Sequence, residues 1–346
     1  MNKQFDVILV GLGPMGRIIL NLIFKRKNLN LKGVVDIDPQ LAGENLREFV
    51  NVEDTVDMVI EPDLESILER EKIDIVIIAT SSSLERVSPT IKSAVKFGCN
   101  VISLCEELSY PFLNYPHISE ELDALAKKNK VTIVGTGINP GYLMDLLPIV
   151  ITAPCQRVRS IKVTRMMNST KRRESFQRKI GTGLTPEEFH QKISKKEITG
   201  HVGLTQSIQL ISAALGFEYE KIVELPPKEI ITKREFTTSY GELVSEGSVC
   251  GLQSIAHALN GGLEIISLDF VAYAGDHDEY DSILIDGIPK IHQKIIGGVH
   301  GDLGTSAMVL NLIPKVIEAK SGLLTMKDLP VPCNTENIWK NEFGVI

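Results

Sequence analysis

The chain has 346 residues, of which 43% are hydrophobic and 23% charged, as in an ordinary folded protein of about two domains. Its net charge of −7 argues against a general nucleic-acid binder, which needs a basic surface. Five scattered cysteines and seven scattered histidines predict neither a disulfide framework nor a metal site. Because we find no signal peptide and no uninterrupted apolar run of transmembrane length, we expect a cytoplasmic protein without a membrane partner.

The first 140 residues alternate strand-like and helix-like segments. We expect strands at residues 6–10, 31–36, 73–80, 100–104 and 131–136, and helices at 15–27, 63–70, 84–97 and 118–129. Near-continuous apolar strands separated by helices indicate a parallel sheet covered on both faces. Residues 1–140 are therefore expected to form a doubly wound α/β domain of the Rossmann type.

The pattern changes near residue 139. We expect a strand at 158–167, helices at 185–196 and 204–215, and then strand-like runs at 229–236, 243–249, 263–274, 282–285 and 290–296. These runs predict an antiparallel sheet in an α+β domain, residues 141–302, that serves substrate binding or oligomerisation. Residues 303–346 begin with a helix at 303–320, which we expect to return to the first domain.

A glycine-rich turn follows the first strand. Residues 11–16 read GLGPMG, which fits the G-x-G-x-x-G pattern between a strand and an amphipathic helix. Gly11 permits a tight turn, Gly13 lets the backbone approach a pyrophosphate, and Gly16 lets helix and strand pack closely. We expect this turn, with Pro14 and Met15 at the helix N-terminus, to bind a dinucleotide.

The second strand ends at Asp36, whose carboxylate is placed to bind the adenosine ribose diol and to repel a 2′-phosphate. No arginine follows immediately, so the sequence favours NAD, with NADP as the second possibility. The alternative is an ordinary turn at residues 11–16 and a solvated carboxylate at Asp36.

Two further loops follow strands at the carboxyl edge of the predicted sheet, where ligands bind. Hydroxyl groups of Thr80, Ser81 and Ser82 are expected to contact the cofactor, whereas the alternative is a simple helix cap by Ser83. Asn139, in the segment GTGINPGY, is expected to hold the nicotinamide carboxamide, and an interdomain hinge at this place is compatible with that role.

Two adjacent glutamates, Glu106 and Glu107, come directly after the strand at 100–104. Carboxylates in this position could act as a general base or bind an ammonium group. The alternative is a pair of acidic residues favoured by a helix dipole. Cys105 suggests a thiolate nucleophile, although a buried cysteine is more often structural.

The second domain offers two candidates. The basic residues 171–173, with Arg178 and Lys179, could bind a substrate carboxylate or form a solvated loop. His201, which lies between glycines, could orient substrate or relay protons, and a structural role is the alternative.

Several longer motifs point to a family. The segments SLCEELSYP, GTGINPGYLMDLLP, QRKIGTGLTPEEF, GHVGL and GDLGTSAMVLNLIPKVIEAKSGLLTMKDLP occur in this order. The chain thereby resembles the 2,4-diaminopentanoate dehydrogenase family, a distant relative of dihydrodipicolinate reductase, from Gly11 to Pro330. The paired histidines and Lys-x-Asp-x-Pro-Ser-Gly-Thr-like run of that reductase are absent, and only Lys179 and residues 181–183 are similar, which disfavours its reaction.

The resemblance implies an amine dehydrogenase of ornithine fermentation. Such an enzyme oxidises the 4-amino group of 2,4-diaminopentanoate with NAD or NADP to 2-amino-4-oxopentanoate and ammonia, and the reverse reaction is a reductive amination. In related enzymes an acidic residue after this strand is thought to bind ammonia, a role that would belong to Glu106 or Glu107, with Glu107 preferred. The resemblance also implies a homodimer with a small diamino acid as its substrate.

Three other functions stay open at this point. They are a semialdehyde dehydrogenase that uses Cys105, a reductase similar to dihydrodipicolinate reductase, and a dinucleotide sensor without catalytic activity.

Overall fold

We describe a computed structural model of the chain, covering residues 4–49, 57–170, 172–275 and 278–336. The chain divides into two compact units. The first unit comprises Met1–Tyr142 and His300–Ile346, and the second comprises Leu143–Val299. The boundaries expected from the sequence lay at 140/141 and 302/303.

The first unit is built on a six-stranded sheet in which every pair of neighbouring strands is parallel. Its order is β15-β5-β4-β3-β1-β2. The strands are β1 (Phe5–Val10), β2 (Leu29–Val35), β3 (Ile75–Ile78), β4 (Asn100–Ser103), β5 (Thr132–Gly135) and β15 (Gly322–Leu324). The parallel doubly wound sheet predicted from the sequence is thus confirmed, and β15 is a sixth strand that the sequence pattern did not reveal.

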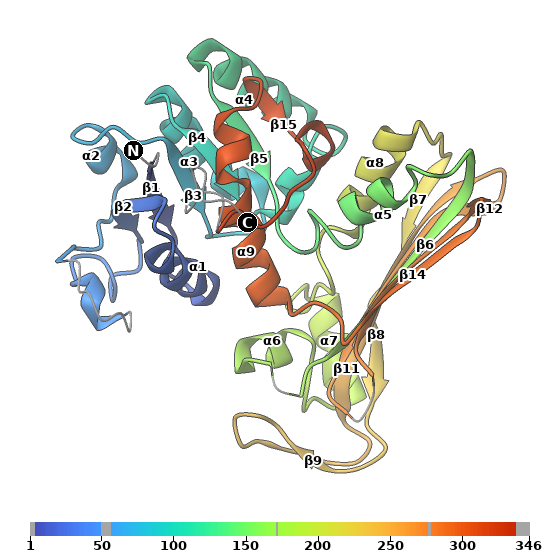
Figure 1. Cartoon of the computed structure of the whole chain (residues 1–346). Coiled ribbons are helices and arrows are strands. Elements are labelled where there is room, and N and C mark those ends of the chain that lie inside the picture. The colour runs from blue at the N-terminus through green and yellow to red at the C-terminus, as the bar shows by residue number, and fades with distance from the viewer. Residues whose placement is uncertain (1–3, 50–56, 171, 276–277, 337–346) are drawn as a thin grey trace, which may run out of the picture. The chain divides into compact units, whose positions relative to one another are not determined.

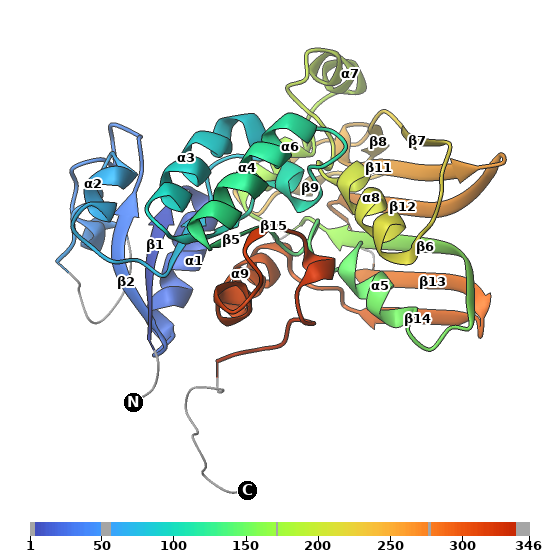
Figure 2. The same cartoon turned by 90° about the horizontal axis from the view of Figure 1, so that it is seen from above.

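Helices cover both faces of this sheet, because its central strands are apolar on both sides. In Figure 2, α3 and α4 lie on one face, and α1 and α9 lie on the other. The helices are α1 (Pro14–Lys25), α2 (Leu64–Leu68), α3 (Leu84–Lys96), α4 (Pro116–Asn129) and α9 (Gly301–Ile317), with the short 3-10 helix η2 (Glu106–Ser109) after β4. Since α9 packs on α1, β4 and β5, the expected return of the C-terminal helix is confirmed.

The second unit holds a seven-stranded sheet of order β14-β13-β6-β12-β11-β7, in which β8 also pairs with β11. Its strands are β6 (Arg157–Asn168), β7 (Lys221–Glu224), β8 (Lys228–Ile231), β11 (Val249–Asn260), β12 (Leu263–Tyr273), β13 (Tyr280–Ile288) and β14 (Ile291–Ile296). The short strands β9 (Phe236–Thr237) and β10 (Leu243–Val244) pair separately. Its helices are α5 (Leu146–Ile151), α6 (Glu174–Lys179), α7 (Pro186–Ser194) and α8 (Leu204–Leu215).

Two expectations for this unit were wrong. The sheet is mixed and not purely antiparallel, because β6 and β12 run parallel. The runs at 229–236 and 243–249 form only short strands, whereas the 12-residue strand β11 was missed, since Gly251, Gln253, Ser254 and His257 dilute its apolar pattern. In Figure 1, α5 and α8 cover one face of the sheet, and α8 packs against β7, β11 and β12.

Candidate active site

The glycine turn between β1 and α1 has the geometry of a phosphate cradle. Gly11 has a φ of +98°, a conformation that glycine adopts without strain. A Cβ on Gly16 would lie 1.9 Å from the Gly11 carbonyl oxygen, so only glycine fits where helix and turn pack. A Cβ on Gly13 would meet no atom within 4 Å and would fill the open space in front of the turn.

The polar groups at this turn also suit a dinucleotide. Gly13 is the N-cap of α1 and provides no capping side chain, so the N–H groups of the first helical turn are left for a phosphate. The Asp36 carboxylate is fixed beside the turn, where its Oδ2 accepts a hydrogen bond of 2.6 Å from the Leu12 N–H and its Oδ1 one of 2.9 Å from the Asp38 N–H. A carboxylate offers about four acceptor positions, so Asp36 can still bind a ribose diol.

The loop after β3 lies beside the glycine turn. The Thr80 Cγ2 atom is 2.8 Å from the position of a Cβ on Gly11, which places this expected cofactor contact at the turn. The Ser81 hydroxyl accepts a hydrogen bond of 3.2 Å from the Ser83 N–H, and the Ser82 carbonyl faces η2. The Ser83 side chain makes no capping hydrogen bond to α3, so the alternative of a simple serine cap is wrong.

Glu107 supplies the contact at the start of α3. Its Oε2 atom accepts a hydrogen bond of 2.7 Å from the Leu84 N–H, so its charge lies at the positive end of that helix. Burial, and then a hydrogen bond to the Glu107 carboxylate and its negative charge, raise the pKa of the Tyr115 hydroxyl, so this hydroxyl stays protonated. The helix-dipole alternative thus describes Glu107 well, and Tyr115 is a partner that the sequence analysis missed.

Glu106 differs from its neighbour. It is the first residue of η2 and is half-buried, and its backbone carbonyl accepts the Ser109 hydroxyl at 2.7 Å. Within the described part of the chain, its carboxylate takes part in no hydrogen bond or ion pair. Of the two adjacent carboxylates at the carboxyl edge of β4, Glu106 therefore keeps all its acceptor positions for a ligand.

Cys105 is unsuited to be a nucleophile. The thiol is 1% exposed and donates a hydrogen bond of 3.0 Å to the Ser82 carbonyl. Burial, with the charges of Glu106 and Glu107 acting in the same direction, raises the pKa of the thiol to about 12. A thiolate is therefore scarce near pH 7, and the cysteine is a packing residue.

The segment that contains Asn139 follows β5 and is tied to α9. The Ile138 N–H donates a hydrogen bond of 3.2 Å to the Thr305 hydroxyl. A Cβ on Gly141, whose φ is +125°, would lie 2.5 Å from the Gly137 nitrogen, so the loop is tight. Asn139 thus lies at the same carboxyl edge as Thr80 and Glu106, since parallel strands end together.

In the second unit, His201 stacks on Phe270 with ring centroids 4.3 Å apart. Burial, together with the positive charges of Lys179 and Arg165, lowers the pKa of His201 to about 3. The imidazole is therefore neutral near pH 7, where it can make hydrogen bonds but cannot supply a positive charge.

The expected basic cluster is dispersed. Lys171 lies outside the described residues. Arg172 is buried with its guanidinium 4.7 Å from the Phe176 ring centroid, whereas Arg178 is exposed and bridges to Glu174 at 2.7 Å. Arg178 is therefore solvated, but it lies in the helix α6 and not in a loop, and Lys179, the last residue of α6, lies near enough to His201 to influence its charge.

A buried ion pair in this unit was missed by the sequence analysis. Arg165 Nη1 lies 3.2 Å from Asp281 Oδ1, and both side chains are almost fully buried. The other ends of the pair bind the Val299 backbone, where Arg165 donates to the carbonyl at 2.7 Å and Asp281 accepts from the N–H at 2.9 Å. In the sequence, the only indication of this ion pair was a positively charged residue at an inward-facing position of β6.

Within the described part of the chain, no group of three His, Cys, Asp or Glu side chains is placed to hold a metal ion. No helix in that part has the length and apolar character needed to cross a membrane.

Comparison with known proteins decides the family. Residues 142–343 match the 2,4-diaminopentanoate dehydrogenase C-terminal domain, and residues 5–137 match an oxidoreductase family with an NAD-binding Rossmann fold. The 2,4-diaminopentanoate dehydrogenase of Acetoanaerobium sticklandii is 32% identical over 336 residues, which cover 95% of this chain and 94% of that protein. This chain belongs to the 2,4-diaminopentanoate dehydrogenase family.

Solved structures show the same fold. An amine dehydrogenase from Mycobacterium smegmatis is 21% identical with a TM-score of 0.81, over 94% of this chain and 96% of that one. A dipicolinate-bound dihydrodipicolinate reductase from Paenisporosarcina sp. TG-14 is 14% identical with a TM-score of 0.54, over 94% of this chain and 98% of that one.

Membership of the diaminopentanoate dehydrogenase family confirms an oxidoreductase whose first unit is an NAD-binding Rossmann domain. The inert thiol of Cys105 further disfavours a semialdehyde dehydrogenase. The preference for NAD over NADP and the roles of the individual site residues stay predictions.

Proposed function

We propose that this member of the family oxidises the 4-amino group of 2,4-diaminopentanoate. The ammonium form of the substrate, NAD⁺ and water give 2-amino-4-oxopentanoate, NADH, an ammonium ion and a proton. The support is the relative of that name at 32% identity. The observation that carries the proposal is the pair of carboxylates after β4, of which Glu106 is uncommitted and suited to bind an ammonium group.

The carboxylates have to perform two tasks in this reaction. The substrate nitrogen must lose a proton before C4 can release a hydride, because only the neutral amine has the lone pair that forms the C=N bond. As the hydride leaves, positive charge develops on the C4–N group, and an adjacent carboxylate stabilises it. We assign contact with the nitrogen to Glu106, while Glu107 positions the loop through Leu84 and Tyr115.

NAD supplies the hydride acceptor. Gly11, Gly13 and Gly16, with Pro14 and Met15, would hold its pyrophosphate at the α1 N-terminus, and Asp36 its adenosine ribose. The carboxylate of Asp36 would repel a 2′-phosphate, which favours NAD over NADP.

Three loops would complete the site. We propose that Thr80, Ser81 and Ser82 contact the cofactor and that Asn139 binds its carboxamide. Neutral His201 would orient the substrate by a hydrogen bond.

The direct test is an initial-rate assay at 340 nm with NAD or NADP and a panel of amines. We expect NAD reduction with 2,4-diaminopentanoate and the product 2-amino-4-oxopentanoate, identified by mass spectrometry. Activity with none of the diamino acids, while NAD still binds, would support the non-catalytic sensor and contradict the proposal.

We further propose a homodimer formed through the face of the second-unit sheet opposite α5 and α8. A cross-strand row on that face carries Val271, Met166, Tyr280 and Ile296, which are mostly apolar. Sedimentation should give twice the 38.2 kDa chain mass, and Met166→Glu should give the monomer. A monomeric wild-type protein would contradict this proposal.

The cysteine chemistry supports a cytoplasmic location. All five cysteines are free thiols, as is usual in a reducing compartment. Fractionation of the source cells tests this proposal.

A further inference from the structure

Arg17 places a guanidinium beside the glycine turn. It belongs to α1 and follows Gly16 directly. Its Nε donates a hydrogen bond of 3.1 Å to the Leu12 carbonyl, and its guanidinium carbon lies 5.3 Å from the Phe49 ring centroid. Arg17 therefore reaches from α1 to the connection between β2 and α2, which begins at Asp36 and contains Phe49.

The guanidinium is held in place but keeps most of its donors. Of the five N–H groups of an arginine, one is used on the Leu12 carbonyl, and the Phe49 ring restrains the guanidinium through a cation–π contact. Within the described part of the chain, the two Nη groups of Arg17 donate no hydrogen bond and form no ion pair. Such a fork matches two oxygens of a phosphate. Because the side chain is already positioned, little conformational freedom is lost on binding.

The backbone of Leu12 also holds the carboxylate of Asp36. The Leu12 N–H donates to Asp36 Oδ2 at 2.6 Å, and the Leu12 carbonyl accepts from Arg17 Nε. The two charges are thus anchored at one residue of the turn, although the described residues include no ion pair between them. Since Asp36 is placed to bind the adenosine ribose diol, Arg17 lies at the ribose end of the dinucleotide site.

The surroundings of Asp36 are otherwise acidic. From Asp36 to Phe49 the sequence contains four acidic residues and one basic residue, Arg47. Arg47 is already paired, because its Nη2 lies 2.6 Å from Asp57 Oδ1. A 2′-phosphate would be repelled here by the Asp36 carboxylate unless a cation compensated. Arg17 can supply that cation.

We propose that Arg17 binds the 2′-phosphate of NADP, so that the site accepts NADP beside NAD. With NAD, the Asp36 carboxylate accepts hydrogen bonds from the ribose diol. With NADP, the Nη groups of Arg17 bind the phosphate and offset its repulsion by Asp36. The preference for NAD is then limited by Arg17. The inference concerns the cofactor alone, so it does not depend on which amine is oxidised.

Calorimetry with the full chain, NAD or NADP and no amine substrate tests the inference. Arg17→Gln should raise the Kd of NADP about 10- to 100-fold, the usual effect of a charge-assisted hydrogen bond. It should change the Kd of NAD by less than about threefold, because NAD has no 2′-phosphate. Arg17→Lys keeps the charge but loses the fork, so its Kd for NADP should lie between those of the wild type and Arg17→Gln.

Arg47→Gln is the matched control, because it removes a charge of the same region that is already paired with Asp57. It should leave both Kd values within about threefold of the wild-type values. Asp36→Asn should act in the opposite direction to Arg17→Gln, with a lower Kd for NADP and a higher Kd for NAD. Adding Arg17→Gln to Asp36→Asn should abolish the gain for NADP.

Equal weakening of NAD and NADP binding in Arg17→Gln would place the guanidinium at the pyrophosphate and overturn the inference. An unchanged Kd for NADP in this variant, or a wild-type protein that does not bind NADP, would also overturn it. Circular dichroism establishes that each variant is folded. If Arg17→Gln does not fold, Arg17→Lys decides by the same comparison of NADP with NAD, because it keeps a cation beside Phe49.

Discussion

Replacement of the two adjacent glutamates after β4, one at a time, should show that Glu107 contributes mainly to stability and Glu106 mainly to catalysis. Glu107 accepts the Leu84 N–H at 2.7 Å and the Tyr115 hydroxyl, so Glu107→Ala leaves both donors without that acceptor. A hydrogen bond to a charged group contributes about 1.5–3 kcal/mol, and the half-buried position favours the lower part of that range. With two such bonds lost, we therefore expect Glu107→Ala to lower the free energy of unfolding by about 3–4 kcal/mol.

Glu106 should behave in the opposite way, because its carboxylate has no partner within the described residues. Glu106→Gln should leave the free energy of unfolding within about 0.5 kcal/mol of the wild-type value. It should lower kcat by about 10²- to 10⁴-fold, the usual contribution of a positioned general base. Glu107→Gln keeps an acceptor for Leu84 and should lose much less activity.

Urea unfolding followed by circular dichroism measures the first quantity, and NADH formation at 340 nm measures the second. The Cm of Glu107→Ala should fall while that of Glu106→Ala stays near the wild-type value. The reasoning is refuted if Glu106→Gln retains full activity, or if the two alanine variants are equally destabilised. An inactive Glu107→Gln beside an active Glu106→Gln would assign the ammonium contact to Glu107.

Three further predictions concern other parts of the site. Gly13→Ala should keep the wild-type Tm but weaken NADH binding in calorimetry at least about 10-fold, because the new Cβ fills the open space expected to receive the pyrophosphate. Gly16→Ala should weaken binding and also lower Tm, because the new Cβ collides with the Gly11 carbonyl oxygen. Cys105→Ala should retain turnover, and iodoacetamide at pH 8 should not inactivate the wild-type enzyme; rapid inactivation would contradict the buried thiol. In the folded protein the pKa of His201 is lowered from 6.5 to about 3, so below about pH 6.5 the unfolded chain binds more protons than the folded one. The free energy of unfolding should therefore fall as the pH drops below about 6.5. His201→Phe should make this fall smaller when unfolding is measured as a function of pH.

The parts of the fold that local sequence determines were predictable. The first strand, the glycine turn and α1 combine an apolar run, three glycines at fixed spacing and an amphipathic helix, and each feature is decided within a few residues. The strand β15 has only three residues, and its conformation depends on pairing with β5, whose sequence is nearly 200 residues away. The parallel pairing of β6 with β12 is likewise decided between distant segments, which alternation in either strand cannot reveal.

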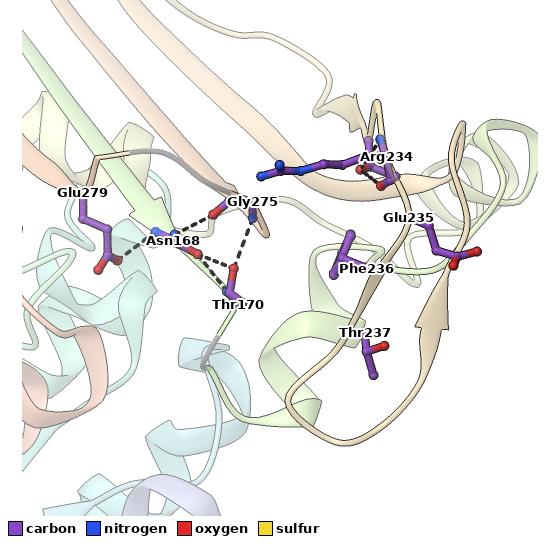
Figure 3. Close-up of a pocket in the computed structure, with 9 residues that line it drawn as sticks. Asn168, Thr170, Arg234, Glu235, Phe236, Thr237, Gly275 and Glu279 are labelled. Atoms are coloured by element: carbon purple, nitrogen blue, oxygen red, sulfur yellow. Dashed lines mark hydrogen bonds between the residues drawn. The ribbon is translucent and has the colours of Figure 1, made fainter.

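The candidate site shows the same division. The sequence located Glu106 and Glu107 at the end of a strand, but their different roles depend on Leu84, 23 residues earlier, and on Tyr115. In the second unit, a separate cavity is lined by Asn168, Arg234 and Glu279, which come from three separated segments, and no motif marked any of them (Figure 3). Side-chain environments of this kind follow from tertiary contacts, so sequence patterns indicate the candidates but not their tasks.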